Sequence, residues 1–328
     1  MSGNWENAFY PADRRTKGRR VAGGMGKVEE VFGAKMREFT TVGIGGPAER
    51  MVFPHAAREV QEILAAERAA GREVRALGAG SNLLVSDGGV RGTVICLKKN
   101  MGNVLFSGGA AVVADGGTIL PRFAVLCALS GLSGAAELAG IPGTVGGALS
   151  MNAGAYGRSL GDIVAGVGIA DLEGGRRRAG GRGVRLAYRG AAFPVTGIVV
   201  RAAFRLHPAS PDDVFALMKT LNEKRRASQP WGERTFGSTF RNPPGGEKAG
   251  VLLEKAGPTA AISIGTPVAV TRADRDYYAL LVANSWLGEH RTFHGRLMNV
   301  MRAARGANYG DYFYIAGFIP DGGGTFPG

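Results

Sequence analysis

Three glycine-rich segments of this chain have the residue types and the spacing to hold an anionic cofactor on backbone N–H groups. The longest, residues 131–157, contains too many glycines for a helix or a strand, yet it is too apolar for a disordered linker. Leu138, Val145 and Leu149 are core-type residues interleaved with the glycines, which indicates buried loop backbone. Buried N–H groups need partners, and a bound anionic cofactor is one natural partner. A tightly packed turn region without a ligand is the alternative.

The other two segments are shorter. In residues 77–89 the order Gly78-x-Gly80-Ser81-Asn82 would let a pyrophosphate lie against backbone amides, with two side-chain donors added. The third glycine of the dinucleotide fingerprint is absent, so this motif alone is weak evidence. Residues 40–48 are also compatible with a strand that ends in a glycine turn.

Hydrophobic periodicity indicates the elements that position these segments. Val60, Ile63 and Leu64 share one face of a helix, and the apolar strand 74–77 that follows opens into the second segment. Strands are expected over 110–114 and 198–206, and a helix near 120–129.

A further helix is expected from Ser210, because a cap, a proline and two acids stand at its start. The residues predicted for its apolar face are Val214, Leu217, Met218 and Leu221. We expect a third subdomain to begin here.

Composition limits the function classes. The 328 residues include 54 glycines and carry a net charge of +13. The basic residues are scattered with few aromatics among them, so nucleic-acid binding is the minor interpretation and anionic cofactors or substrates the major one. The triple arginine 176–178 is expected at a solvated hairpin tip. Cys96 and Cys127 lie in apolar runs, are expected in the core and suit a reducing cytoplasm. No apolar stretch predicts a membrane span, and no signal peptide is expected.

Taken in order, the three segments resemble the UDP-N-acetylenolpyruvoylglucosamine reductase family over about residues 39–257. The run Gly-Ile-Pro-Gly-Thr-Val-Gly-Gly-Ala at 140–148 and Met-Asn-Ala-Gly-Ala-Tyr-Gly at 151–157 carry the resemblance, together with Gly-Ala-Gly-Ser-Asn-Leu-Leu-Val-Ser-Asp at 78–87. Tyr188-Arg189 and Gly-Ser-Thr-Phe-Arg-Asn-Pro at 237–243 match the family's catalytic segments.

The resemblance implies an α+β protein with the FAD-binding fold of the vanillyl-alcohol-oxidase type. Two α+β subdomains, about 37–100 and 101–206, would hold FAD. A third α+β subdomain, 207–328, would bind substrate and is atypical after 257. Residues 1–36 are expected to be an N-terminal extension.

The implied activity is the reduction of UDP-N-acetylglucosamine enolpyruvate to UDP-N-acetylmuramate in peptidoglycan biosynthesis. The implied cofactors are noncovalent FAD and NADPH as the hydride source, since no side chain supplies hydride. We expect a cytoplasmic monomer that binds a UDP-sugar, with no nucleic-acid or membrane partner.

The resemblance also implies site residues. Ser238 would be the proton donor and Arg189 the cation that stabilises the intermediate. Lys224, Arg225 and Arg241 are candidates to stabilise the serine alkoxide. The residues implied for substrate binding are Tyr156, Tyr188, Arg225 and Asn242, although either tyrosine could be a core residue. The residues implied for cofactor binding are Gly43, Gly45, Gly46, Gly78, Gly80, Ser81, Asn82, Gly140, Ile141, Pro142, Gly143, Thr144, Gly147, Ala148, Asn152, Gly154 and Ala155. No metal ligand is implied.

Two departures from the family pattern leave alternatives open. Ala191 stands where the family has a serine, and nothing after Gly257 matches the segment that bears the family's catalytic glutamate. Beyond Gly257 the only glutamate is Glu289, which cannot be aligned to that position, and Asp311 and Asp321 are candidate carboxylate substitutes. The tail is a divergent subdomain, a frame-shifted sequence, or the mark of a flavin-binding protein that has lost reductase activity. A flavin oxidase with another substrate is a weaker alternative.

Overall fold

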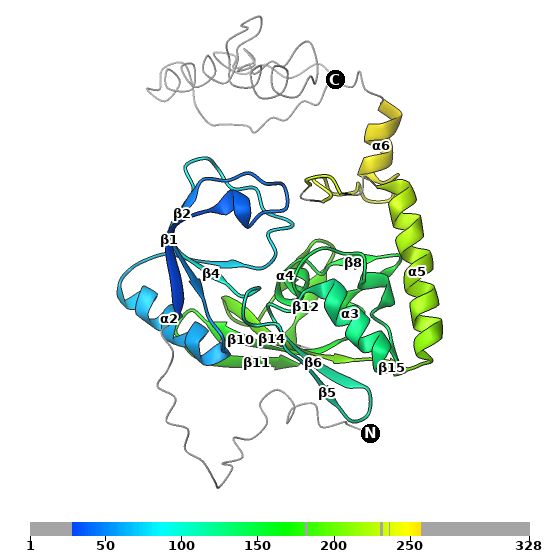
Figure 1. The fold of residues 1–328 in the computed structure, drawn as a ribbon, viewed down its shortest axis with the longest axis horizontal. Helices are drawn as coiled ribbons and strands as arrows, with labels where there is room; N and C mark the ends of the chain where they lie inside the picture. The colour runs from blue at the N-terminus through cyan, green and yellow to red at the C-terminus, as the bar shows by residue number, and fades with distance from the viewer. Residues whose placement is uncertain (1–27, 181–182, 230–231, 236, 257–328) are drawn as a thin grey trace, which may run out of the picture. The chain divides into compact units, whose positions relative to one another are not determined.

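A computed structural model describes residues 28–180, 183–229, 232–235 and 237–256 (Figure 1). The chain divides into two compact units, Met1–Leu252 and Leu253–Gly328. The sheets and the helices that pack on them belong to the first unit.

The first sheet has four strands in the order β1-β2-β4-β3. The strands are β1 (Glu29–Lys35), β2 (Pro47–Phe53), β3 (Val74–Leu77) and β4 (Val90–Cys96). β2, β3 and β4 are parallel, whereas β1 is antiparallel to β2. Helix α2 (Ala57–Ala69) makes the crossover from β2 to β3 and buries Val60 and Leu64. The chain leaves this crossover at Leu77 and enters the second glycine segment.

The second sheet has five antiparallel strands in the order β11-β10-β14-β6-β5. The strands are β5 (Val104–Ser107), β6 (Ala111–Asp115), β10 (Val164–Asp171), β11 (Arg176–Gly180) and β14 (Gly197–Arg205). Arg201 lies opposite Asp115 in the register and forms an ion pair with it at 2.8 Å. This pair satisfies a buried carboxylate in the centre of the sheet.

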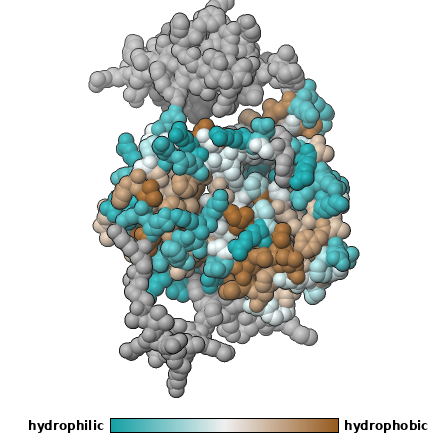
Figure 2. Space-filling model, in the orientation of Figure 1, coloured by the Kyte–Doolittle hydropathy of each residue, from teal (hydrophilic) through white to brown (hydrophobic). Residues whose placement is uncertain are grey.

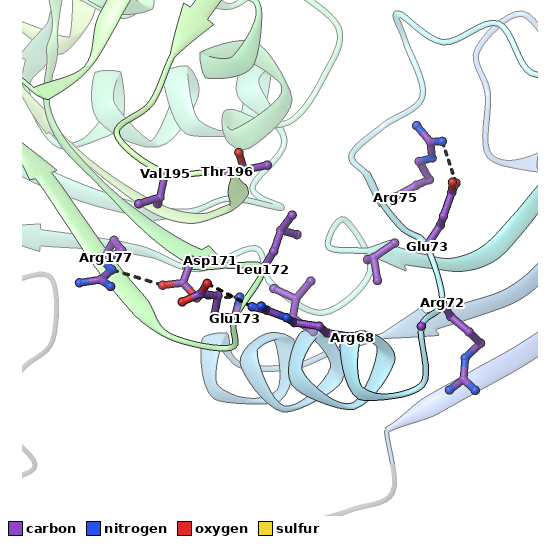
Figure 3. Close-up of a pocket in the computed structure, with 13 residues that line it drawn as sticks. Arg68, Arg72, Glu73, Arg75, Asp171, Leu172, Glu173, Arg177, Val195 and Thr196 are labelled. Carbon is purple, nitrogen blue, oxygen red and sulfur yellow. Dashed lines mark hydrogen bonds and ion pairs between the residues drawn. The ribbon is translucent and has the colours of Figure 1, made fainter.

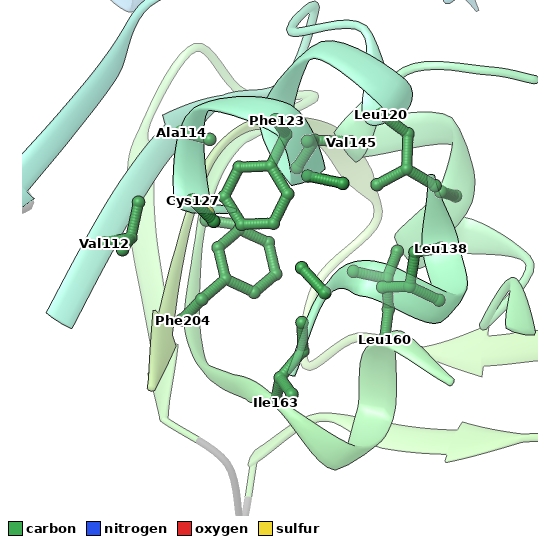
Figure 4. Packing of buried hydrophobic residues seen from close by; sticks show 14 of the residues in the cluster. Val112, Ala114, Leu120, Phe123, Cys127, Leu138, Val145, Leu160, Ile163 and Phe204 are labelled. Atoms are coloured by element: carbon green, nitrogen blue, oxygen red, sulfur yellow. The ribbon is translucent and has the colours of Figure 1, made fainter. Parts of the chain in front are cut away.

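The main hydrophobic core lies where helices α3 (Leu120–Leu129) and α4 (Val145–Ser150) pack on the second sheet. Phe123 of α3 meets Phe204 of β14 with ring centroids 4.7 Å apart and planes inclined by 47° (Figure 4). Cys127 is buried in the same cluster, and burial raises the pKa of its thiol to about 12. Cys96 is buried as well. The prediction that both cysteines are core residues is confirmed.

A second core joins the two sheets through α2. Val52 and Ile95 of the first sheet share it with Leu64 of α2 and with Ile198 and Val200 of the second sheet. The two sheets therefore form one unit around this helix.

Short elements complete the described part of the chain. Three two-stranded ladders pair β7 (Leu132–Ser133) with β15 (His207–Pro208), β8 (Gly154–Ala155) with β9 (Arg158–Ser159), and β12 (Arg185–Ala187) with β13 (Gly190–Ala192). The remaining elements are η1 (Met36–Glu38), η2 (Ala136–Leu138), η3 (Leu160–Asp162), α5 (Pro211–Ser228) and α6 (Ala249–Ala256).

The mixed helix and strand content confirms the α+β class. Helix α3 coincides with the helix expected near 120–129, and the strand expected over 74–77 is β3. The subdomain boundaries stay predictions. Figure 2 shows apolar surface over α3, whose Val125 and Leu129 are exposed.

Two expectations about helices are wrong. Leu217 is 42% exposed, because α5 packs on one side only and its stripe Val214, Met218 and Leu221 already fills that contact. The long glycine segment does contain a helix, α4. A Cβ on its Gly146 would lie 3.0 Å from the Gly116 carbonyl oxygen, so the glycine is what lets this short helix pack against the sheet.

Within the described ranges, no helix is long and apolar enough to cross a membrane. The same part of the chain contains no group of three His, Cys, Asp or Glu residues that could hold a metal ion.

Candidate active site

The three glycine segments come together in the fold, and we refer to residues 40–46, 78–89 and 140–147 as the first, second and third glycine loops. The Thr41 N–H donates to the Gly80 carbonyl at 3.2 Å and joins the first loop to the second. Ser81 Oγ donates to the Pro142 carbonyl at 3.0 Å and joins the second loop to the third. Backbone far apart in the sequence therefore forms one continuous surface.

Close packing between the loops explains several of the glycines. A Cβ on Gly80 would lie 1.9 Å from the Phe39 carbonyl oxygen. A Cβ on Gly78 would lie 2.4 Å from Thr144 Oγ1, and one on Gly46 would also collide with backbone. These glycines are required by packing within the protein, as the alternative of a tightly packed turn region without a ligand predicts. These glycines therefore do not by themselves indicate a ligand, whereas hydrogen-bond donors around the loops would.

The first turn of α4 is satisfied within the protein. Thr144 Oγ1 accepts from the Gly147 N–H at 3.4 Å. The N–H groups of Val145 and Gly146 donate to carbonyl oxygens of the 116–118 turn, each at 2.8 Å. The part of the third loop that precedes the helix is thus better able to face a ligand than the helix start.

Positive charge lies directly against two of the loops. A Cβ on Gly43 would lie 2.7 Å from Arg234 Nη1, and a Cβ on Gly140 would lie 3.0 Å from Arg225 Cδ. Guanidinium groups, the side-chain amide of Asn82 in the second loop and exposed turn backbone form a donor set suited to phosphates, whereas the single Ser81 O–H is already engaged with Pro142. The residues present therefore fit the diphosphate of an FAD cofactor.

Two hairpin turns hold predicted site residues in unusual backbone conformations. The β8–β9 turn carries Tyr156 with φ of +54°, and the β12–β13 turn carries Arg189 with φ of +61°. Positive φ favours glycine or asparagine, so a tyrosine and an arginine at these turns are held at a conformational cost. Residues held in such conformations cluster at active sites and ligand-binding sites.

The Tyr156 turn is anchored to α5. The Tyr156 hydroxyl donates to the Leu221 carbonyl at 2.8 Å, and the tyrosine remains 46% exposed. Arg225, one turn further along α5, lies against Gly140. Helix α5 thus carries one predicted substrate residue and positions another.

The two segments predicted to carry the catalytic residues, Tyr188–Arg189 and 237–243, are also in contact. The Asn242 N–H donates to the Tyr188 hydroxyl at 3.2 Å, and Asn242 Oδ1 accepts from the Ala249 N–H at 3.0 Å. The Asn242 N–H and the neighbouring Arg189 hold the pKa of Tyr188 below its ordinary value, because both stabilise the phenolate. Arg189 therefore lies beside the segment that contains Ser238.

That segment reaches the glycine loops as well. Thr41 Oγ1 donates to the Thr235 carbonyl, and a Cβ on Gly237 would lie 4.0 Å from the Ser81 carbonyl oxygen. Ser238 itself is exposed. The chain around the predicted proton donor thus borders the first and second loops.

Some residues predicted to bind the cofactor instead pack against, or hydrogen-bond to, other parts of the protein. Asn152 has φ of +42° and accepts from the Gly161 N–H through Oδ1 at 3.0 Å. Ala148 is 6% exposed inside α4. A Cβ on Gly154 would lie 2.6 Å from the Arg158 carbonyl oxygen. Direct contact of these residues with a ligand stays a prediction.

Arg234 and Thr41 are the residues that sequence reasoning missed. Both belong to contacts between segments far apart in the chain; no motif marks Arg234, and Thr41 lies in the first glycine segment without being singled out there. The triple arginine 176–178 is exposed, but it lies along the edge strand β11 and not at a hairpin tip, because the turn is made by residues 172–175.

A cavity of about 750 Å³ lies elsewhere, beside the end of α2 and the β10–β11 turn (Figure 3). Its charged side chains are paired: Arg68 with Glu173 at 3.2 Å and Arg177 with Asp171 at 3.3 Å. None of the residues predicted for catalysis or binding lines it. The candidate site is therefore the surface formed by the glycine loops and not this cavity.

The family model described as "FAD binding domain" matches residues 48–180 of the chain. This range contains the second and third glycine loops and most of both sheets.

Relatives match over most of their length. The UDP-N-acetylenolpyruvoylglucosamine reductase of Rubrobacter xylanophilus is 39% identical over 232 residues, which cover 69% of this chain and 75% of the relative. The enzyme of the same name from Rickettsia bellii is 33% identical over 222 residues, 68% of this chain and 73% of the relative. A crystal structure of UDP-N-acetylenolpyruvylglucosamine reductase from Thermus caldophilus has a TM-score of 0.60 at 32% identity, covering 70% of this chain and 80% of that one.

Proposed function

Because this chain belongs to the UDP-N-acetylenolpyruvoylglucosamine reductase family, we propose that it reduces UDP-N-acetylglucosamine enolpyruvate to UDP-N-acetylmuramate. FAD is the bound cofactor and NADPH the hydride source. The reaction, which yields UDP-N-acetylmuramate, belongs to peptidoglycan biosynthesis. The observation that supports this most is the convergence of the three glycine loops with the Tyr188–Arg189 turn and the 232–242 segment.

When bound, FAD supplies the hydride that the terminal vinyl carbon of the substrate receives. In the proposed mechanism Arg189 stabilises the negative charge that develops at the carbon bearing the carboxylate. Ser238 then gives a proton to that carbon.

The fixed turn of Arg189 supports its assigned role. A two-residue hairpin with positive φ at Arg189 leaves the backbone little freedom, which fixes the point from which the side chain extends. Its guanidinium carbon lies 5.8 Å from the centroid of the Tyr188 ring, beside the segment that contains Ser238. A cation fixed in advance costs little reorganisation when the charge develops.

Ser238 needs help to act as an acid, because a serine hydroxyl ionises far above neutral pH. Of the candidate cations, Arg241 lies three residues away and contributes to the lowered pKa of Tyr188, which puts its charge near this turn. We propose that Arg241 contributes most to stabilising the serine alkoxide and that Lys224 and Arg225 contribute less.

Tyr156, Tyr188, Arg225 and Asn242 bind the UDP-sugar in this proposal. The glycine loops with Ser81 and Asn82 hold FAD, and Arg225 and Arg234 add positive charge beside them. We further propose that the protein acts as a cytoplasmic monomer. We also propose that it has no nucleic-acid partner, because its basic residues are scattered along the sequence.

A second candidate is a flavin-binding protein that no longer reduces the sugar. The observation that favours it is the matched share of the relatives, 73% and 75% in two of them, which leaves about a quarter of each outside the alignment. The family's catalytic glutamate is expected in a segment that nothing after Gly257 matches, and residues 257–328 lie outside those the structure describes.

The test is to purify the full chain, record the visible flavin spectrum and follow NADPH oxidation with and without the enolpyruvyl UDP-sugar. Substrate-dependent oxidation that Ser238→Ala abolishes while the flavin stays bound supports the reductase. A yellow protein without substrate-dependent oxidation supports the second candidate.

A further inference from the structure

A second cavity, of about 670 Å³, lies between β1, β2 and α2 and is strongly acidic. Its charged lining consists of Glu30, Glu49, Glu59, Glu62, Glu67, Arg50 and Arg72. Five carboxylates against two guanidinium groups leave an excess of three negative charges, whereas the whole chain carries +13. We call this the acidic cavity. Its charge favours a cationic ligand.

The two arginines of the lining are already engaged. Glu67 is 1% exposed and accepts two hydrogen bonds from Arg72, at 2.7 and 3.0 Å. It also accepts from Thr93 at 2.8 Å and pairs with Arg50, which in turn pairs with Glu30 at 2.8 Å. This network neutralises the floor of the cavity and leaves its negative excess at the rim.

The carboxylates at the rim, Glu49 and Glu62 among them, can accept further hydrogen bonds. Glu49 accepts one hydrogen bond from the Gly92 N–H at 2.8 Å, and Glu62 pairs with the exposed Arg58 at 2.8 Å. A carboxylate has about four acceptor positions, so each can take a further guanidinium.

An exposed aromatic ring stands beside these carboxylates. Phe32 is 69% exposed, lines the acidic cavity and lies opposite Arg50 in the β1–β2 register. An aromatic face next to carboxylates is the combination that binds an arginine side chain, because the guanidinium stacks on the ring while its N–H groups reach the acceptors.

This chain contains a segment of matching chemistry a few residues before Val28 in the sequence. Residues 14–20, Arg-Arg-Thr-Lys-Gly-Arg-Arg, carry five positive charges and lie outside the described residues. Val28 lines the acidic cavity, and the eight residues from Arg20 to Val28 can span at most about 29 Å. A tether of this length gives an effective concentration on the order of millimolar.

We propose that the acidic cavity is a docking site for the basic segment 14–20 of the same chain, held by guanidinium–carboxylate pairs and by stacking on Phe32. This inference does not rest on the reductase activity, since none of these residues belongs to the candidate active site.

The test is limited trypsin digestion of the full chain at low salt, with cleavage after Arg14, Arg15, Lys17, Arg19 and Arg20 timed by mass spectrometry. In the wild type these bonds should be cut about tenfold more slowly than in Phe32→Ala/Glu62→Lys, and salt should remove the difference. Phe32→Ala alone should give part of the effect and leaves every ion pair in place. Glu173→Lys, which removes an exposed acidic group of the other cavity, is the control and should leave the protection intact.

Equal cleavage rates in wild type and double variant would overturn the proposal. Protection that disappears on dilution would also overturn it, because the segment would then dock on a second copy. Matching thermal unfolding of all variants ensures that the rates report docking and not loss of the fold.

Discussion

Ser81 Oγ donates a hydrogen bond to the carbonyl oxygen of Pro142 across 3.0 Å, and this bond joins the second glycine loop to the third. The two residues are 61 positions apart in the chain. The second loop follows β3 of the first sheet, whereas the third leads into α4, which packs on the second sheet. The bond therefore helps to fix the relative position of the two halves of the proposed FAD site.

Replacing Ser81 by alanine should weaken FAD binding. A lost hydrogen bond of this kind is worth about 1 kcal/mol, so we expect a roughly fivefold increase in the FAD dissociation constant, measured by flavin fluorescence titration. Ser86→Ala in the same loop is the control, because its hydroxyl makes only a long contact of 3.5 Å with Gly89. An unchanged FAD affinity in Ser81→Ala would show that this hydrogen bond does not contribute to FAD binding.

Gly80 should tolerate no side chain. Its φ is +66°, and a Cβ would lie 1.9 Å from the Phe39 carbonyl oxygen. Gly71 has a similar φ of +64° with nothing within 4 Å and is a matched control. We expect Gly71→Ala to cost about 1 kcal/mol of unfolding free energy and Gly80→Ala about 3 kcal/mol or more, measured by denaturant unfolding. Equal costs would show that the first and second loops can separate without penalty.

Arg189→Gly should separate stability from activity. Glycine relieves the positive φ of +61° in the β12–β13 turn, so the unfolding free energy should stay level or rise by up to about 1 kcal/mol. Turnover should nevertheless fall by at least about 100-fold, because the stabilising cation is gone. Thermal unfolding and steady-state rates check the two parts. If Arg189→Gly kept its activity, the arginine would have no role in the chemistry.

Glu67 should make stability depend on pH. Hydrogen bonds from Arg72 hold its pKa below the ordinary glutamate value, despite the opposing effect of burial. A lowered carboxyl pKa stabilises the fold above the pKa of the unfolded state, and this contribution is lost as pH falls through the folded-state pKa.

Glu67→Gln should therefore be less stable than the wild type at neutral pH, by about 3 kcal/mol, with a gap that closes under acid conditions. Urea unfolding at a series of pH values measures this. Glu62→Gln, which breaks only an exposed ion pair among the described residues, should cost less than about 0.5 kcal/mol at every pH. A gap for Glu67→Gln that stays constant with pH would contradict the lowered pKa.

Local patterns in the sequence were enough to predict the positioning elements. The apolar run 74–77 became β3, and Leu120–Leu129 became α3, because both are short segments whose periodicity and propensity agree. Leu217 was misplaced because periodicity alone does not say how wide the packed stripe of α5 is. The sequence does not predict helix α4, because glycine has a low helix propensity and Gly146 is required by tertiary packing against Gly116.

The site could be predicted only through its motifs. That Gly78 packs on Thr144, or that Arg234 lies on Gly43, depends on contacts between distant segments that no local pattern encodes. For the same reason the sequence did not show that Gly46, Gly78 and Gly80 are required by loop packing, a role that exists whether or not a cofactor is bound. The assignments of individual residues to FAD or to the sugar stay predictions.

The most direct test of the central claim is anaerobic stopped-flow absorbance of the FAD-loaded full chain in two steps. NADPH should first bleach the flavin, and the enolpyruvyl UDP-sugar added next should restore the yellow colour as the sugar is reduced. In Ser238→Ala the first step should persist and the second should be lost. A wild-type protein that bleaches and never recovers would contradict the reductase activity, and one that binds no flavin would contradict the cofactor site itself.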